Sequence, residues 1–399
     1  MDNPKDEKLR EKRVNFFATL VLALICSIWL STDISTFAFM SALNVSSDFK
    51  VGDFYNRVSD LATVRRQSDK VVIVDIGSGG RLEIAAALDA IASAAPAAVG
   101  VDFVFPYTSD PAIDSLLVGA LGRCPGPVLA HDIDMADGNG EMASFFVDSH
   151  PEWRYASTRL VADKAINLIR ELADSFPGPD GRRLQSFATS LVALGAPEAY
   201  RHYRESGGGV RMIDYPRRSF LIVKPEEIAE MPHMLRDKIV IVGDTTGFGD
   251  LHRTPVMDEM PGVFIHACAV ATVIDSSYPR DVTDVTTWGL GVALCAFIMW
   301  IKIFLKPDIA GFLMRAAQLL LVIVIVWFGC WLFEHTGLIL DIKKPVLMIL
   351  LGLLVYDLWT GLPGLYGRVK ALVLSWRKPS TKISGGDGRN DEKYKPNLQ

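Results

Sequence analysis

Four long apolar runs stand out along the chain, one near its start and three near its end. A helix needs roughly 20 predominantly apolar residues to cross the hydrocarbon core of a bilayer, and each run approaches that length. The pattern therefore predicts four transmembrane helices, at 14–33, 285–305, 313–333 and 343–362. The apolar centres of these runs hold a single charged residue, Asp357, which lies near one end, where it can reach water.

Lysine and arginine residues around these runs predict their orientation. Five of them precede the first run, three lie between the second and third, and eight follow Gly364, whereas the loop between the third and fourth runs holds two. By the positive-inside rule, residues 1–13 and the basic, partly disordered tail 363–399 are cytoplasmic, and residues 34–284 are periplasmic. The first run could instead be a cleaved signal peptide, but it is longer than a usual signal core and no small-x-small cleavage site follows it.

Between the first and second runs, short β-branched strands alternate with segments of helical periodicity. The patterns KVVIVDIG, AAVGVDFVF and GPVLAHDID predict buried strands, with the helices RLEIAAALDAIASAA and DPAIDSLLVGALGR between them. This alternation indicates a parallel core with right-handed crossovers. The predicted fold class is an α/β extracytoplasmic domain, with a mixed, largely parallel sheet and flanking helices, plus an all-α four-helix transmembrane portion.

The ends of the first two strands carry aspartates. Asp75 and Asp102 end or cross strands that we expect to be adjacent and parallel, so their carboxylates would meet at the carboxyl edge of the sheet, where α/β folds tend to bind ligands. Such a pair could hold a hard cation or the hydroxyl groups of a ligand. The alternative is that each aspartate caps a turn or pairs with an arginine.

The loop after the first strand, DIGSGGRLE, places glycines between a strand and a helix, as phosphate-binding loops do. Gly77, Ser78 and Arg81 could therefore bind an anion through backbone N–H groups and the guanidinium. The loop matches neither common nucleotide-binding motif, because no Lys-Ser/Thr pair follows the glycines. A tight turn between strand and helix is the alternative.

The later stretch KIVIVGDTTGFGDLHRTP predicts a last core strand followed by a structural loop. The glycines expected to adopt positive φ are Gly243, Gly247 and Gly249. Asp250 would fix this loop near the helix that begins after Pro261 and contains His266. Because that helix leads toward the second membrane run, we expect the loop to act as a joint between the domain and the membrane.

Cysteines and histidines add weaker candidates. Three of the five cysteines fall within membrane runs, which leaves Cys124 and Cys268 outside the bilayer. A disulfide between these two is chemically allowed there, but the apolar helical pattern around Cys268 favours a buried small hydrophobe. The candidate metal ligands are His131, Asp132 and Asp134 in LAHDID, and His252 with His266 across the later loop. Neither group has the spacing of a zinc site, so no metal and no cofactor are predicted.

Four motifs together resemble a known family. They are VVIVDI with Asp75, VGVDFVF with Asp102 and Phe105, DKIVIVGDTTGFGDLHRTP, and MPGVFIHA with His266. From Lys70 to Ile274 the chain resembles the second type of CHASE domain (CHASE2), an extracytoplasmic sensory module found ahead of bacterial cyclases and kinases and typically followed by three transmembrane helices. Two departures stand beside this resemblance: the segment after the first strand is shorter than in the family, and no output domain follows the last apolar run.

We therefore expect a bacterial inner-membrane protein that is sensory or receptor-like and not an enzyme. Its periplasmic domain would bind a small molecule or a protein, and its lipid-embedded helices would signal to a separate partner in the membrane or cytoplasm, with homo-oligomerisation possible. A net charge of −5 without a basic face argues against nucleic acid as a partner, and no Ser-centred catalytic elbow occurs. The alternative is a non-catalytic structural or assembly subunit of a bacterial envelope complex.

Overall fold

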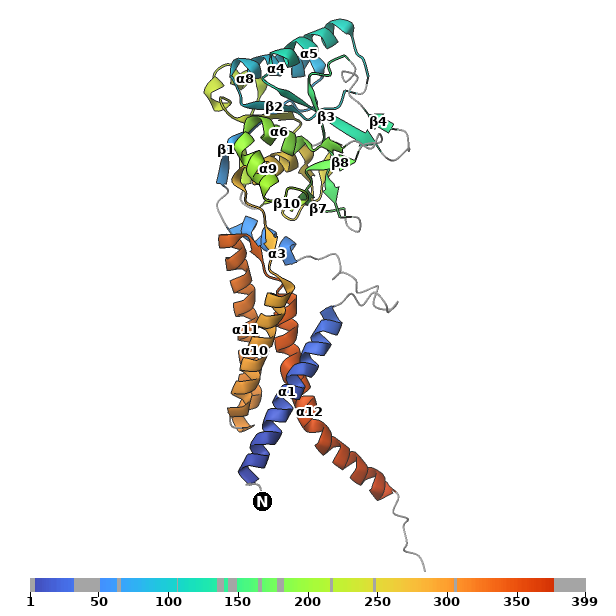
Figure 1. Ribbon diagram of the computed structural model, residues 1–399, viewed down its shortest axis with the longest axis vertical. Coiled ribbons are helices and arrows are strands. Elements are labelled where there is room, and N and C mark those ends of the chain that lie inside the picture. The colour runs from blue at the N-terminus through green and yellow to red at the C-terminus, as the bar shows by residue number, and fades with distance from the viewer. Residues whose placement is uncertain are drawn as a thin grey trace, which may run out of the picture.

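The chain folds into an α/β domain that stands on a group of long helices, with a short helix, α3 (Val51–Ala62), between the two parts (Figure 1). This computed structural model describes residues 4–31, 51–62, 66–105, 107–134, 140–142, 149–163, 167–177, 183–215, 218–246, 249–304 and 307–376. Gly247, one of the predicted loop glycines, lies outside the described residues. The predicted fold class, an α/β domain with a largely parallel sheet plus four long apolar helices, is confirmed.

A seven-stranded sheet forms the centre of the domain, in the order β11-β1-β12-β2-β3, with β4 and β5 both paired to β3. Its strands are β1 (Arg66–Asp75), β2 (Ala98–Val101), β3 (Pro127–Asp134), β4 (Gly140–Met142), β5 (Arg154–Ser157), β11 (Arg218–Val223) and β12 (Ile239–Gly243). Every pairing is parallel except that of β3 with β4. Parallel neighbours need long crossover connections, and α-helices supply them here.

β12 occupies the middle of this sheet. It pairs with Val71–Asp75 of β1 on one side and with Ala98–Val101 of β2 on the other. All five residues of β12 are buried, because an uninterrupted apolar strand needs cover on both of its edges and both of its faces. The expectation that β1 and β2 are adjacent is therefore wrong: a strand from much later in the chain separates them.

Helices cover both faces of the sheet. They are α4 (Arg81–Ser93), α5 (Pro111–Arg123) and α8 (Pro225–Ile228) on one face, and α6 (Phe187–Gly195), α7 (Pro197–Glu205) and α9 (Gly262–Asp275) on the other. Side chains alternate along β1, so that Val72 and Val74 enter the first core while Val71 and Ile73 enter the second. At the start of α5, the Asp110 carboxylate accepts a hydrogen bond from a backbone N–H of the first turn, as its position before a proline predicts.

The two cores separate the cysteines of the domain. Cys124 lies in the core beside α4 and α5, whereas Cys268 lies in the core beside α6 and α9. The sheet stands between them and both thiols are free, so the disulfide that the sequence allowed is not formed. Burial raises the pKa of each thiol to about 12, which keeps both cysteines protonated and unreactive.

Short strands extend the domain toward the long helices, and Figure 1 shows β7 and β10 at that end. They are β6 (Val161–Ala162), β7 (Ile169–Leu172) and β10 (Arg211–Met212), which form one small sheet, β8 (Ser175–Pro177) with β9 (Arg183–Gln185), and β13 (Leu251–His252) with β14 (Met260–Pro261). Each of these small sheets is antiparallel. The small sheet with β7 places Arg170 near the membrane side of the domain.

Four helices are long and apolar enough to cross a membrane, judged by length and composition. They are α1 (Pro4–Ser31), α10 (Asp284–Phe304), α11 (Pro307–Thr336) and α12 (Lys343–Trp376). α1 and α10 pack along α12, and Cys295, Met299 and Met348 are among the side chains buried between the helices. Residues 363–376, expected to form part of a separate basic tail, continue α12 without a break (Figure 1).

Candidate functional site

The predicted site at the carboxyl edge of the sheet is a row of three strand ends. The register pairs Asp75 with Gly243, and the Asp102 N–H donates to the Val242 carbonyl at 2.9 Å, which places Asp102 on the far side of β12. The two aspartates therefore flank β12 and do not lie on adjacent strands. Gly243 does not adopt positive φ, contrary to the prediction. It is required instead because a Cβ there would lie 2.7 Å from Cγ2 of Val263 in α9.

Asp75 connects two loops. Its Oδ1 accepts hydrogen bonds from the Gly77 N–H at 3.1 Å and the Thr245 N–H at 3.0 Å. These bonds hold the turn after β1 against the loop after β12. A carboxylate that accepts such bonds caps a turn, which was the alternative considered for Asp75. Ligand binding by this side chain stays a prediction.

The glycine-rich turn after β1 is also held from within. Gly77 adopts a φ of +57°, and Ser78 is exposed in the turn. The Arg81 guanidinium pairs with Asp114 of α5, and its carbon lies 5.6 Å from the centre of the Phe105 ring. Because the arginine that would attract an anion already has a carboxylate beside it, the arrangement favours a tight turn between strand and helix.

Two aspartate and histidine pairs lie at the start of α9. Nε2 of His266 is 3.9 Å from the Asp102 carboxylate, and Nε2 of His252 is 2.7 Å from that of Asp250. Burial raises the pKa of Asp102, the neighbouring histidines oppose this shift, and Asp250 adds to it. The hydrogen bond from His252 lowers the pKa of Asp250. In the part of the chain that the structure describes, no group of three or more His, Cys, Asp or Glu side chains is placed to hold a metal ion.

The later loop meets α9 at its first residue. Gly249 adopts a φ of +92°, the left-handed conformation predicted for it. The Asp250 carbonyl accepts a hydrogen bond from the Gly262 N–H at 3.1 Å, and a Cβ on Gly262 would overlap the Asp250 carboxylate. The loop is thus fastened to the N-terminus of α9.

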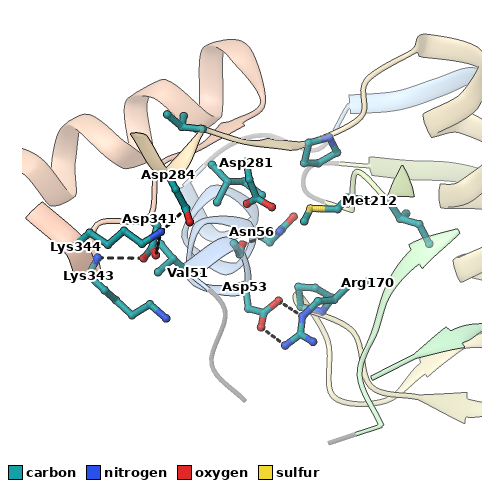
Figure 2. Close-up of a pocket in the computed structure, with 16 residues that line it drawn as sticks. Val51, Asp53, Asn56, Arg170, Met212, Asp281, Asp284, Asp341, Lys343 and Lys344 are labelled. Carbon is teal, nitrogen blue, oxygen red and sulfur yellow. Dashed lines mark hydrogen bonds and ion pairs between the residues drawn. The ribbon is translucent and has the colours of Figure 1, made fainter. Parts of the chain in front are cut away.

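A cavity of about 300 Å³ lies between the α/β domain and the long helices (Figure 2). We call it the junction cavity. α3 forms one wall, and segments 279–284 and 339–344, which lead into α10 and α12, form others. These two segments are joined by the parallel pair β15 (Arg280–Asp281) and β16 (Leu338–Ile339). The cavity is therefore bordered by the connections between the domain and the helices.

Arg170 fastens α3 to the domain. Its Nε and Nη2 donate to the two carboxylate oxygens of Asp53 at 2.8 and 2.6 Å (Figure 2), and its Nη1 donates to Asp163 at 2.8 Å. The side chain is only 7% exposed. Burial opposes the positive charge, but the bonds to both carboxylates outweigh burial and raise the pKa of Arg170. A bidentate, charge-assisted pair of this kind is strong and directional.

Lys344 fastens the two connecting segments to each other. Its ammonium donates to the Asp284 carboxylate at the start of α10 and lies 3.4 Å from the Asp341 carboxylate (Figure 2). Asp284 itself is mostly exposed, whereas the Lys344 side chain is largely buried. The first turns of α10 and α12 are therefore linked by charge at the edge of the cavity.

α3 also rests directly on α11. Tyr55 is 1% exposed, and its hydroxyl donates to the Leu340 carbonyl at 2.8 Å. Its ring stacks on Phe333 with the centroids 5.8 Å apart. Gly329 of α11 leaves room for this contact, since a Cβ there would overlap the Tyr55 hydroxyl. α3 and α11 are therefore in direct, packed contact.

Asn56 contributes a polar group with an unused hydrogen-bond position. The residue lines the junction cavity and is 6% exposed. Its Nδ2 donates to the Gly52 carbonyl at 2.7 Å, and its Oδ1 is buried with no hydrogen-bond partner among the described residues. Buried polar atoms are nearly always paired in folded proteins, so this oxygen is an exception that calls for an explanation.

The junction cavity was not predicted from the sequence. A usable signal was present, because Asp53 and Asn56 are three residues apart and so lie on one face of a helix. Their surroundings were not readable, since Asp53 and Arg170 are 117 positions apart, and Lys344 and Asp284 are 60 apart. No local pattern reveals such pairs.

An α/β domain on four helices of membrane-spanning length defines a multi-pass membrane protein with one large domain outside the bilayer. The family profile of the CHASE2 domain matches residues 34–305, which is more than half of the chain, and the chain belongs to this family. It is thus a membrane protein with an extracytoplasmic CHASE2 sensory domain. No curated protein and no solved structure matches the chain.

Proposed function

We propose that this protein is a receptor of a bacterial inner membrane, whose periplasmic domain binds a small molecule or protein and signals through its helices to a separate partner. One observation carries the proposal: the contacts that join the domain to the helices surround a cavity of ligand size. A group that enters or leaves the junction cavity changes the spacing of the segments around it. Those segments lead directly into α10 and α12.

The mechanism is a shift between two arrangements of α3 and the connecting segments. In one arrangement, Tyr55 is seated against Gly329 and Phe333, and Lys344 links α10 to α12. In the other, a ligand moves α3 relative to α11. A ligand shifts this equilibrium only by the difference in its affinity for the two states, so the walls of the cavity must differ between them.

A structural or assembly subunit of an envelope complex is the second candidate. The observation that favours it is the internal pairing of the polar groups at the carboxyl edge of the sheet, the usual ligand position of an α/β fold. A domain without a ligand there can serve as a docking surface. The two candidates differ in whether the association with a partner depends on conditions.

Affinity purification after mild crosslinking tests the proposal. The wild type and Gly329→Leu are compared in cells grown under several envelope conditions. A receptor gives partner recovery that changes with conditions in the wild type and no longer changes in Gly329→Leu, because the displaced Tyr55 no longer couples α3 to α11. A stoichiometric complex recovered equally from both proteins under every condition would support the structural subunit. Gly289→Leu is the matched control, because nothing lies within 4 Å of a Cβ at this position in α10.

A further inference from the structure

A buried hydrogen-bond acceptor lies in the wall of the junction cavity. Asn56 is 6% exposed and lines the cavity, on the same helix as Asp53 (Figure 2). Its Nδ2 donates to the Gly52 carbonyl, which fixes the orientation of the amide, so the atom without a partner among the described residues is the oxygen. A buried acceptor without a donor is unfavourable. A molecule that supplies an O–H or N–H group here therefore gains a hydrogen bond.

The charged side chains of the lining do not favour an ion of either sign. Six of the seven have interactions within the protein, and these are Asp53, Arg170, Asp281, Asp284, Asp341 and Lys344. The seventh, Lys343, is exposed, so water solvates its ammonium group. A charged ligand would have to compete with the existing partners and lose its own hydration. The lining therefore favours an uncharged molecule.

Apolar side chains make up much of the remaining lining. Among them are Val51, Met212, Ile213, Pro255, Val282 and Ile339. A lone water molecule would satisfy the Asn56 oxygen, but water against these walls leaves their apolar surface hydrated. An apolar molecular body in the same place releases that water, which is favourable. The cavity therefore combines a hydrogen-bond acceptor with apolar walls, as small-molecule sites in proteins commonly do.

We propose that the junction cavity binds an uncharged molecule that carries a hydroxyl group on an apolar body. The hydroxyl group donates to Oδ1 of Asn56, and the body packs against the apolar lining. The volume of about 300 Å³ is at the lower end of the range for ligand sites, so the bound part of the molecule is small. This inference rests on the proposed receptor function and names the chemical class of its ligand.

Two sources could supply such a hydroxyl group. A soluble alcohol could enter from the aqueous side, since Asp284 and Lys343 are exposed. The glycerol end of a neutral lipid with a free hydroxyl group, a diacylglycerol, could enter from the membrane side, because α10 and α12 begin at the cavity. Both sources present the same O–H group to Asn56, and the test separates them.

The test titrates the full-length protein in phosphatidylcholine nanodiscs with n-hexanol and follows its melting temperature. The matched probe is methyl n-pentyl ether, an isomer of n-hexanol whose oxygen cannot donate a hydrogen bond. Both compounds dissolve in the bilayer, so the difference between their effects isolates the O–H group. We expect n-hexanol to raise the melting temperature relative to the ether, and this difference to saturate. Equal responses, which a cavity filled only by water would give, or a difference that does not saturate would overturn the proposal.

Two variants locate the binding. Asn56→Leu removes the acceptor at similar volume, and Val282→Phe adds bulk to the lining while Asn56 stays in place. Asn56→Leu should weaken n-hexanol binding about fivefold, the effect of losing one hydrogen bond between neutral groups, and Val282→Phe should abolish the saturable response. Val285→Phe is the matched control, since this residue of α10 is 85% exposed and lies outside the lining. An unchanged affinity in either variant, once shown to be folded, would refute the assignment.

Nanodiscs that contain a diacylglycerol identify the source. A lipid that occupies the cavity competes with n-hexanol and reduces its effect, whereas a soluble ligand gives the same effect with and without this lipid; either result supports a hydroxyl site. Binding is measured here without a signalling readout. If n-hexanol fails to bind while partner recovery still depends on conditions, the ligand assignment fails and the receptor function stands. If n-hexanol binds and partner recovery never changes, the reverse holds.

Discussion

At the carboxyl edge of the sheet, polar side chains connect loops and helix starts within the α/β domain; at the junction cavity, charged side chains connect the domain to α3 and the start of α10 to the start of α12. Asp75 joins two turns and Arg81 is held by Asp114. Around the cavity, Arg170 and Lys344 each bridge elements far apart in the chain, and the Asn56 oxygen is left over.

Polar side chains have different structural roles in these two regions. Carboxylates that cap loops make a rigid edge in which Gly243 and α9 are in close contact. At the junction, ion pairs join different elements around a cavity, so the geometry of the junction depends on those charges. The proposed receptor function therefore assigns the response to the junction with the helices and a structural role to the usual ligand position of the fold.

Among the variants that test this contrast, Arg170→Met should have the largest effect on the free energy of unfolding. The variant leaves Asp53 and Asp163 without their shared cation, and removing one partner of a buried ion pair costs about 3–5 kcal/mol. We expect a fall of that size in the free energy of unfolding, measured with denaturant on the full-length protein. Arg123→Met, which removes an exposed pair with Asp89, should cost less than about 1 kcal/mol. Similar losses in both variants would contradict the role assigned to Arg170.

Gly243→Ala should come next, because its new methyl group would press on Val263 of α9. Overpacking of this kind costs about 1–3 kcal/mol. Gly249→Ala meets no atom within 4 Å but places alanine at a φ of +92°, which costs about 1–2 kcal/mol. Adding Val263→Ala in a double-mutant cycle distinguishes the two causes. The coupling should be favourable with Gly243→Ala and near zero with Gly249→Ala; equal coupling would show that the contact with α9 is not the reason for Gly243.

Asp75→Ala should cost about 1–2 kcal/mol of stability, since it leaves the Gly77 and Thr245 N–H groups without their acceptor. Asp75→Asn keeps an oxygen at the same place and should cost less. Neither variant should change the response of the melting temperature to added divalent cations. A response to divalent cations that disappears in Asp75→Asn would return the ligand site to the carboxyl edge and reverse the contrast drawn above.

The smallest expected effect is the dependence of stability on pH through Asp102. Burial raises the pKa of Asp102 above its ordinary value of 3.8, with His266, His252 and Asp250 facing it. The folded state therefore holds this proton more tightly than the unfolded state, so the contribution of Asp102 to stability is present at low pH and is lost as pH rises through the folded pKa. Asp102→Asn cannot ionise, and its melting temperature relative to the wild type should rise as the pH is increased from about 4. A difference that is constant with pH would contradict this.

Much of the fold was predictable because its signals are local. Short β-branched runs identify β1 and β2, helical apolar spacing identifies α4, and the Asp110-Pro111 pair marks the start of α5. The order of the strands was not, since β12 pairs with β1 and β2 across most of the domain and its insertion between them leaves no mark on either strand. Strand pairing depends on contacts between residues far apart in the sequence. A prediction that pairs strands in their order along the chain therefore makes neighbours of strands that the fold separates.

The candidate site, too, could be predicted only where its features are local in the sequence. Gly249 and the loop at α9 could be predicted from composition, because positive φ is a local demand that glycine meets. Gly243 could not, since its constraint is the approach of Val263 from another element. The junction cavity was out of reach for the same reason: its walls come from α3, the end of the domain and two interhelical segments, and only Asn56 and Asp53 share a local pattern.

The central position of β12 also governs when the domain can fold during synthesis. β1 and β2 leave the ribosome early, but the strand that fills the gap between them follows only with Ile239–Gly243, shortly before α10 begins. Until then two inner strand edges stay unpaired, a state prone to misassembly. The central sheet can therefore be completed only when the chain has almost reached its second membrane helix. A chaperone that shields these edges would act on the growing chain in that interval.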